Sequence, residues 1–366
     1  MNKRILLYLG HPAQFHFFKY IIEQLQKDGC QIKILLKTKD ILEELVCEWG
    51  YDYENIQKKV RKNNFASIAW ASLARTIKVF NIARKYKPDL MVGGDASIAQ
   101  VSKILHIPGI TVLEDDIEII KKLANVTFPY SDSIVVPSVC RVGKWEDKKI
   151  SYYGYMKLAY LHPSFFTPNI EVKKKYIVEC KYCLVRLAQL TAYHDTDVNG
   201  LNIDVILDFI NLAKDSGYVV YISSEKELDE RLRSYQLKIR YNDIHHVMYY
   251  SSLLISDSQS MSVEAAMLGV PSIRFSDFAG RISVLEELEH VYKLTLGIKT
   301  NQTKELLLKA NELLSTLNLK EEFQRRRLIM LRDKINVTSF LVWFIENYPE
   351  SKITIQNNPS YQYKFQ

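Results

Sequence analysis

The chain has little glycine, proline and cysteine, and it lacks a long apolar run. Its 366 residues include 13 glycines, 10 prolines and 5 cysteines, which excludes a fibrous repeat and a disulfide-rich scaffold. The first apolar stretch, Ile5–Leu9, breaks at Gly10-His11-Pro12, so it is too short for a signal-peptide core or a membrane-spanning helix. The odd, scattered cysteines predict reduced thiols and a cytoplasmic protein.

The remaining composition is that of a globular protein, with 47% hydrophobic and 25% charged residues. A net charge of +7 suits phosphate-bearing ligands, nucleic acid or an anionic membrane surface, and it suits an ordinary lysine-rich surface equally well. The basic residues are dispersed rather than grouped with aromatic ones, so we expect no nucleic-acid partner. One basic cluster lies between Trp49 and Trp70. It predicts either a solvated loop or a peripheral membrane contact through Lys58, Lys59, Arg61 and Lys62.

Short apolar strands alternate with amphipathic helices along both halves of the chain. The strand Lys3–Leu9 precedes the helix Phe15–Lys27, and the alternation restarts at the strand Tyr182–Leu190. This alternation predicts right-handed βαβ units and parallel sheets. The fold class is therefore α/β, with two Rossmann-like parallel-sheet domains.

A proline-containing stretch, Tyr160–Pro168, has no clear period and separates the two halves. We expect an N-terminal domain at residues 1–160, a linker at 161–172, a C-terminal domain at 173–335, a helix at 336–348 and a frayed polar tail at 349–366. The chain is long enough for two separate cores.

Candidate catalytic residues follow three strands of the first half. Ligands of open parallel sheets bind outside the carboxyl ends of the strands. His11 follows the first strand and is a candidate general base, although it could instead cap the next helix. Asp95 follows Gly93-Gly94 and is a candidate base or a helix cap. Glu114 and Asp115 follow another strand and could bind sugar hydroxyls, act as a base, or belong to a solvated loop.

Hydroxyl side chains gather where a strand of the second half turns into a helix, at Ser256–Ser262. Hydroxyls, first-turn N–H groups and the helix dipole together predict an anion site. Glu264 is expected at an exposed helix start, within reach of a ribose diol. A serine cap with a dipole-favourable glutamate would explain part of this pattern. The predicted substrate-binding residues are Ser258, Gln259, Ser260, Glu264 and the arginines Arg186, Arg274 and Arg281, which suit a pyrophosphate.

Several separate blocks resemble the uncharacterised domain-of-unknown-function 354 family over about residues 1–345. They are His11–Phe18, Gly154-Tyr155 with Leu158–Pro163, Ile222–Glu225, Ile244–Val247 and Asp257–Met261. That family is similar to the superfamily of GT-B glycosyltransferases and UDP-GlcNAc 2-epimerases. The resemblance implies a GT-B fold with an interdomain cleft and a C-terminal helix that crosses back onto the N-terminal half.

The same resemblance implies site roles. In the superfamily a Ser/Gly-rich turn and a glutamate hold the diphosphate and ribose of a UDP-sugar, and Ser258, Ser260 and Glu264 match them. The epimerases have Gly-Gly where this chain has Gln259-Ser260. Asp115-Asp116 also replaces an Ala-Gly pair, and an arginine that follows it in the epimerases is missing.

We therefore expect a metal-independent glycosyltransferase without a cofactor. It would move a sugar from a nucleotide diphosphate-sugar to a glycan or lipid-linked acceptor, and the resemblance alone suggests surface polysaccharide synthesis in the cytoplasm or at the inner face of the membrane. A non-hydrolysing NDP-sugar 2-epimerase is one alternative, because the acidic loops suit it. A non-catalytic nucleotide-sugar binding protein is the other.

Overall fold

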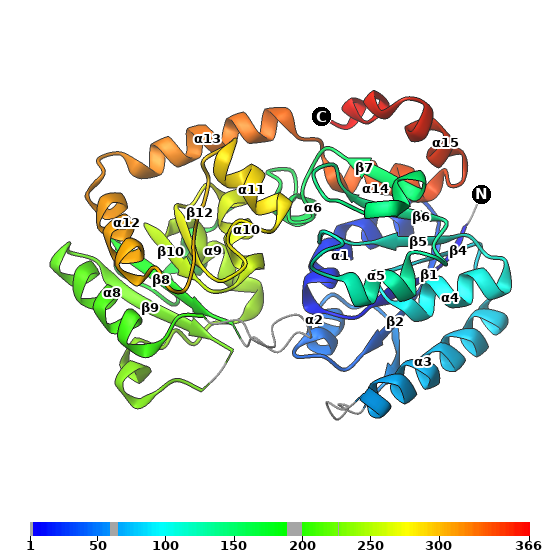
Figure 1. The fold of residues 1–366 in the computed structure, drawn as a ribbon, viewed down its shortest axis with the longest axis horizontal. Helices are drawn as coiled ribbons and strands as arrows, with labels where there is room; N and C mark the ends of the chain where they lie inside the picture. Colours follow the sequence, from blue (N-terminus) through cyan, green and yellow to red (C-terminus); the bar gives the residue numbers. More distant parts are fainter. Residues whose placement is uncertain (1–2, 59–64, 189–199, 226) are drawn as a thin grey trace. The chain divides into compact units, whose positions relative to one another are not determined.

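The computed structural model describes residues 3–58, 65–188, 200–225 and 227–366. The chain divides into two compact units (Figure 1). Unit 1 contains residues 1–160 and 334–366, and unit 2 contains residues 161–333. Each unit is built on its own parallel sheet, as the alternation of strands and helices predicts.

The sheet of unit 1 has seven parallel strands in the order β3-β2-β1-β4-β5-β6-β7. Residues Ile5–Leu9 of β1 are all buried, because helices cover both faces and a central parallel strand then has no solvated side. The strands are β1 (Arg4–Leu9), β2 (Gln31–Lys37), β3 (Tyr53–Gln57), β4 (Leu90–Gly93), β5 (Gly109–Val112), β6 (Ser133–Pro137) and β7 (Lys149–Tyr152).

Right-handed crossovers place α1 and α2 on one face of this sheet and α3, α4 and α5 on the other (Figure 1). On the second face, Leu6 and Tyr8 of β1 pack against Val79 of α3 and Val101 of α4. The helices are α1 (Pro12–Lys27), α2 (Leu42–Glu48), α3 (Phe65–Tyr86), α4 (Ala96–Leu105) and α5 (Lys121–Thr127), followed by η1 (Gly143–Lys148) and α6 (Leu158–Leu161).

The C-terminal segment belongs to unit 1, where α14 (Val337–Glu346) packs against α1. The expectation of a frayed tail is wrong, because α15 (Glu350–Asn357) and η4 (Pro359–Phe365) are folded. An aromatic contact and a hydrogen bond hold this segment in place. The ring of Trp343 stacks on Tyr361, and the buried Gln362 accepts a hydrogen bond from the Tyr153 N–H. The tail is polar overall, but its aromatic residues supply an apolar contact that packs it against α14.

Unit 2 has a five-stranded parallel sheet in the order β12-β11-β10-β8-β9. Its core lies between the sheet and helices α8 and α12, and includes Val185, Phe209 and Ile255. The strands are β8 (Tyr182–Leu187), β9 (Val219–Ser224), β10 (Leu253–Ser256), β11 (Ser272–Phe275) and β12 (Leu296–Ile298).

The remaining elements of unit 2 are helical. Helix α10 packs against α9, α11 and α13. The helices are α7 (Ile170–Lys174), α8 (Ile203–Asp215), η2 (Glu230–Tyr235), η3 (Tyr241–Asp243), α9 (Ile244–Tyr250), α10 (Gln259–Leu268), α11 (Ser283–His290), α12 (Thr303–Ser315) and α13 (Leu319–Asp333). Among the described residues of the whole chain, no helix combines the length and the apolar character needed to cross a membrane.

Candidate functional site

The three candidate catalytic loops of unit 1 lie at one edge of its sheet. Strands β1, β4 and β5 are neighbours and run parallel, so their carboxyl ends meet at the same edge. His11 follows β1, Asp95 follows β4, and Glu114 and Asp115 follow β5. The structure therefore brings these four residues to one edge. His11 and Asp95 lie on separate loops, and Glu114 and Asp115 share a third.

His11 caps helix α1. Its Nδ1 accepts a hydrogen bond from the Ala13 N–H at 3.1 Å, and its backbone is extended with φ of −156°. Because Nδ1 accepts, the proton of a neutral His11 ring is carried by Nε2. This arrangement favours the capping role, since the nitrogen that would take up a proton is already an acceptor.

Asp95 caps helix α4 and pairs with a buried arginine. Its Oδ1 accepts from the Ser97 N–H at 2.9 Å and from Arg75 Nε at 3.1 Å. Burial alone would raise the pKa of the Asp95 carboxyl, but Arg75 and the hydrogen bonds from Ser97 outweigh it and lower the pKa. The preceding Gly94 is closely packed, because a Cβ there would lie 2.9 Å from the end of the Gln14 side chain and 3.1 Å from the Val112 carbonyl oxygen.

Glu114 is held by residues from the end of unit 1's first segment. Its Oε1 accepts from the Met156 N–H at 2.8 Å, and its Oε2 pairs with Lys157 Nζ at 2.5 Å. Lys157 is buried, so this is a nearly enclosed ion pair. Asp115 is half-buried beside it, and the fully buried Asp116 accepts from the Arg141 N–H.

The β10–α10 turn of unit 2, residues 256–260, lies at the carboxyl end of the central strand. Ser258 caps α10 by accepting from the Met261 N–H, and Ser256 Oγ accepts from the Ser258 N–H. The N–H groups of Gln259 and Ser260 belong to the first helical turn, where no intrahelical acceptor exists. The turn thus offers hydroxyls and N–H groups at the positive end of the helix dipole.

Glu264 is buried, so the expectation of an exposed helix start is wrong. It lies in the second turn of α10, which is surrounded by α9, α11 and α13. Its Oε2 is 3.2 Å from Nε2 of His245 on α9, and both side chains are less than one-tenth exposed. A buried carboxylate needs a partner, and His245 lies at ion-pair distance from Glu264, although no hydrogen bond joins the two atoms.

Two of the predicted arginines flank the β10–α10 turn. Arg186 on β8 and Arg274 on β11 are both in register with Ser256. Arg186 donates to Ser223 Oγ at 2.8 Å and pairs with Glu225. Its Nε has no hydrogen-bond acceptor among the described residues.

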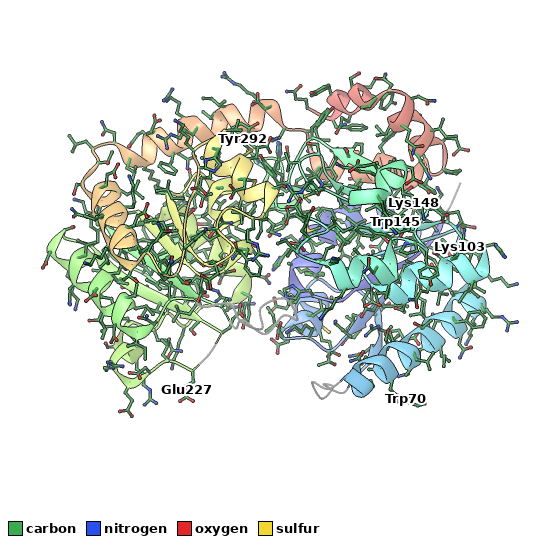
Figure 2. The ribbon with its side chains drawn as sticks, in the orientation of Figure 1. Trp70, Lys103, Trp145, Lys148, Glu227 and Tyr292 are labelled. Carbon is green, nitrogen blue, oxygen red and sulfur yellow. The ribbon has the colours of Figure 1, made fainter. Side chains whose placement is uncertain are left out.

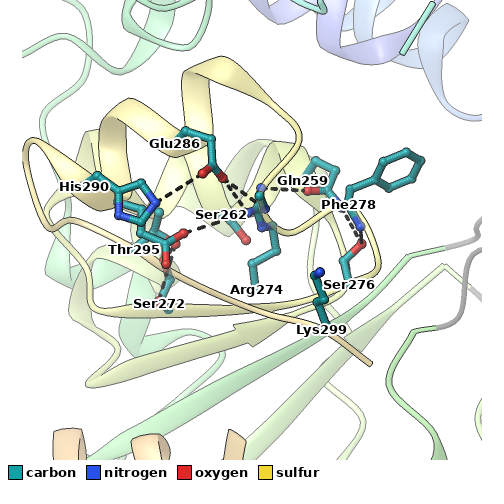
Figure 3. Close-up of polar contacts among 12 residues, drawn as sticks. Gln259, Ser262, Ser272, Arg274, Ser276, Phe278, Glu286, His290, Thr295 and Lys299 are labelled. Carbon is teal, nitrogen blue, oxygen red and sulfur yellow. Dashed lines mark hydrogen bonds and ion pairs between the residues drawn. The ribbon is translucent and has the colours of Figure 1, made fainter. Parts of the chain in front are cut away.

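Arg274 is fully enclosed rather than presented at the surface. Its Nη1 donates to Gln259 Oε1 at 3.2 Å, and Gln259 Nε2 donates to Ser276 Oγ (Figure 3). Burial lowers the pKa of Arg274, while Glu289 and Glu286 oppose that effect. Arg274 therefore holds the side chain of Gln259, the first residue of α10, through this hydrogen bond. Arg281, by contrast, is exposed and lies over the ring of Phe278.

Among the residues that the structure describes, one group of side chains has the spacing of metal ligands. Ligand atoms of Glu286, Glu289 and His290 lie within 4.8 Å of one another. The Arg274 guanidinium is 3.8 Å from Glu286 and 3.9 Å from Glu289 (Figure 3). A cation there would compete with the buried guanidinium of Arg274. We therefore interpret Glu286 and Glu289 as the counter-charge of Arg274.

Three partners were not identified by the sequence patterns: Arg75, Lys157 and His245. Arg75 lies within the helical pattern of α3, and nothing in its spacing marks the pair with Asp95. Lys157 and His245 lie within or beside sequence blocks that resemble the family, at 154–163 and 244–247. The resemblance of those blocks to the family could have marked both residues as candidate site residues.

Solved structures with the same fold include epimerases and glycosyltransferases. The Staphylococcus aureus MnaA–UDP structure has a TM-score of 0.68 at 12% identity, covering 95% of this chain and 97% of that one. The Methanocaldococcus jannaschii UDP-GlcNAc 2-epimerase with UDP-GlcNAc and UDP gives 0.61 at 15%, covering 89% and 99%. The spinosyn rhamnosyltransferase SpnG with spinosyn aglycone gives 0.61 at 11%, covering 94% and 100%.

These similarities confirm a GT-B type fold of two Rossmann-like sheets. A comparison with curated proteins found no match. A family model described as "Protein of unknown function (DUF354)" matches residues 4–345. The chain therefore belongs to the DUF354 family, as the sequence blocks predict.

Proposed function

We propose that this protein is a glycosyltransferase that uses a nucleotide diphosphate-sugar. The β10–α10 turn is the observation that supports this most directly. It combines serine hydroxyls with the N-terminus of a ten-residue helix, which suits a diphosphate. Arg186 and the enclosed Arg274 lie on the strands beside this turn, both in register with Ser256, and add positive charge there. Two solved structures with the same fold are complexes with UDP, and one of them also contains UDP-GlcNAc.

In this proposal the diphosphate lies at Ser258 and Ser260, and Glu264 accepts hydrogen bonds from the ribose hydroxyls. The acceptor oxygen attacks the anomeric carbon of the sugar. The bond from that carbon to the diphosphate breaks, and the nucleoside diphosphate leaves with the bonding electron pair. A base takes the proton from the attacking hydroxyl.

The acceptor and the base are assigned to unit 1. Its sheet edge carries His11, Asp95, Glu114 and Asp115. The contacts of the first three are structural: a cap for His11, and ion pairs for Asp95 and Glu114. A glycan or lipid-linked acceptor and a role in surface polysaccharide synthesis belong to the same proposal.

An NDP-sugar 2-epimerase is the second candidate, because Asp95 and Glu114 follow adjacent strands. An epimerase must move a proton at the sugar C2 through such groups. The pairs with Arg75 and Lys157 oppose this, since both carboxylates are already engaged by basic side chains of their own unit. The transferase is therefore the better supported activity.

A donor screen followed by a turnover assay tests the proposal. UDP, GDP, CDP and ADP and their sugars are screened by thermal shift, where a ligand at one hundred times its Kd adds about 2.7 kcal/mol of stability. The stabilising sugar nucleotide is then incubated without acceptor. We expect no interconversion of sugars at C2. Rapid interconversion would establish the epimerase, and an absence of any stabilising nucleotide would contradict both activities.

A further inference from the structure

An exposed apolar stripe runs along helix α3. Trp70, Leu73 and Ile77 are 72%, 52% and 52% exposed, and their spacing places them on one side of the helix. The opposite side packs on the sheet through Val79 and Ala83. Trp70 lies on the side of α3 that faces away from the sheet (Figure 2). Contiguous exposed apolar side chains of this size mark a binding surface.

The charge on this layer of helices is entirely of one sign. Helices α3, α4 and α5 contain no aspartate or glutamate in their sequences. Helix α4 packs against both neighbours, so the three form one continuous layer (Figure 1). Its exposed charged side chains are Lys78, Arg84, Lys85, Lys103, Lys121 and Lys122.

The other two helices also expose apolar residues, Ile104 on α4 and Val126 on α5. The nearest acidic residues along the chain are Asp89, Asp95, Glu118 and Asp132. The first three pair with Arg4, Arg75 and Arg141, and Asp132 accepts a hydrogen bond from the Gly109 N–H. Three of these four carboxylates are therefore paired with arginines. We call the outer surface of α3, α4 and α5 the basic–apolar face.

We propose that the basic–apolar face docks on an anionic lipid bilayer. An interfacial helix inserts tryptophan and aliphatic side chains at the headgroup level, while flanking lysines and arginines meet lipid phosphates. The stripe on α3 has this order, with Trp70, Leu73 and Ile77 followed by Arg84 and Lys85. Exposed aliphatic residues such as Leu73 and Ile77 favour lipid over nucleic acid, because they can enter a bilayer interface but make no contact with phosphates.

The proposal for the basic–apolar face does not rely on the basic cluster between Trp49 and Trp70. Lys59, Arg61 and Lys62 lie outside the described residues, and Lys58 is exposed. The inference also does not depend on the proposed reaction, because the face lies wholly within unit 1 and the β10–α10 turn belongs to unit 2. Vesicle binding can therefore fail while nucleotide binding succeeds, and the reverse.

Vesicle flotation with the full chain tests the proposal. The wild type should float with phosphatidylcholine vesicles that contain about one-third phosphatidylglycerol, and not with pure phosphatidylcholine. Binding should be lost in about 1 M salt, where screening acts within about 3 Å. The combined variant W70S/L73S/I77S should lose at least about tenfold in partitioning. R84Q, K85Q and K103Q should each lose about fivefold.

Matched variants in unit 2 supply the control. Leu308 and Leu317 are 69% and 89% exposed, so L308S/L317S removes comparable apolar surface elsewhere and should float like the wild type. Thermal melting confirms that each variant is folded. If the serine variant is unstable, the three glutamine variants and the salt dependence still decide. Equal binding to both kinds of vesicle, unchanged binding in every α3 and α4 variant, or binding of an oligonucleotide in place of vesicles would overturn the proposal.

Discussion

At the carboxyl edge of unit 1's sheet, Asp95 and Glu114 hold basic partners from their own unit, whereas the edge of unit 2 presents donors. The pairs with Arg75 and Lys157 satisfy the carboxylates internally. The β10–α10 turn instead offers serine hydroxyls and first-turn N–H groups, with arginine nitrogens behind them. The two sheet edges of one architecture thus differ: the carboxylates of unit 1 are paired within their own unit, and the turn of unit 2 is the one to which we assign an anionic ligand.

The largest effect should follow removal of Lys157. K157M leaves the Glu114 carboxylate nearly enclosed without its cation, which costs about 3 kcal/mol of unfolding free energy. The double variant E114Q/K157M should recover most of this loss, because no buried charge remains. Denaturant unfolding of the wild type, K157M and E114Q/K157M measures both effects. A stable K157M protein would show that this edge is not internally satisfied, and the comparison would fail.

His245 should matter next, through Glu264. H245A removes the partner 3.2 Å from the buried carboxylate, so affinity for the preferred nucleoside diphosphate should fall by about 1–3 kcal/mol. The penalty for a 2′-deoxy nucleotide should shrink in H245A, since Glu264 no longer faces the ribose in a fixed orientation.

The neighbouring His246, whose Nδ1 accepts from the Asn169 N–H, provides the matched control. H246A should bind both nucleotides like the wild type. A 2′-deoxy penalty that is the same in H245A and the wild type would show that His245 does not act through the ribose contact.

Asp95 makes an acid-dependent contribution to unit 1. Its pKa in the folded protein is lowered from 3.8, so its stabilisation is present above about pH 4 and is lost as pH falls through the folded pKa. Each pH unit between the folded and unfolded pKa corresponds to about 1.4 kcal/mol. The stability gap between wild type and D95N should therefore close on acidification. A gap that stays constant from neutral pH to pH 2 would remove Asp95 from the acid response.

The smallest effect is expected at His11. Loss of its cap in H11A should cost about 1 kcal/mol of stability and leave turnover nearly unchanged. Thermal unfolding beside kcat distinguishes the two roles of this residue. A fall in kcat of about 10²–10⁴ at normal stability would instead identify His11 as the base.

The sequence predicted the fold better than the site. Alternation of strands and helices is a local pattern, and it was sufficient for two parallel sheets and for the turn that Ser258 caps. Burial is set by neighbouring helices, so the enclosure of Glu264 and Arg274 could not be derived from their own segments. The pairs of Asp95 and Glu114 join residues 20 and 43 positions apart, and no periodicity encodes such contacts.

Calorimetric titration with nucleoside diphosphates tests the central claim, that the β10–α10 turn and Glu264 bind a nucleotide. The wild type should bind UDP or GDP, and E264A should weaken the preferred one by about 1–3 kcal/mol. Because Glu264 is buried beside His245, the isosteric E264Q variant serves as the folded control for stability and should also weaken binding. Unchanged affinity in both variants, or no binding of any nucleoside diphosphate by the wild type, would contradict the account.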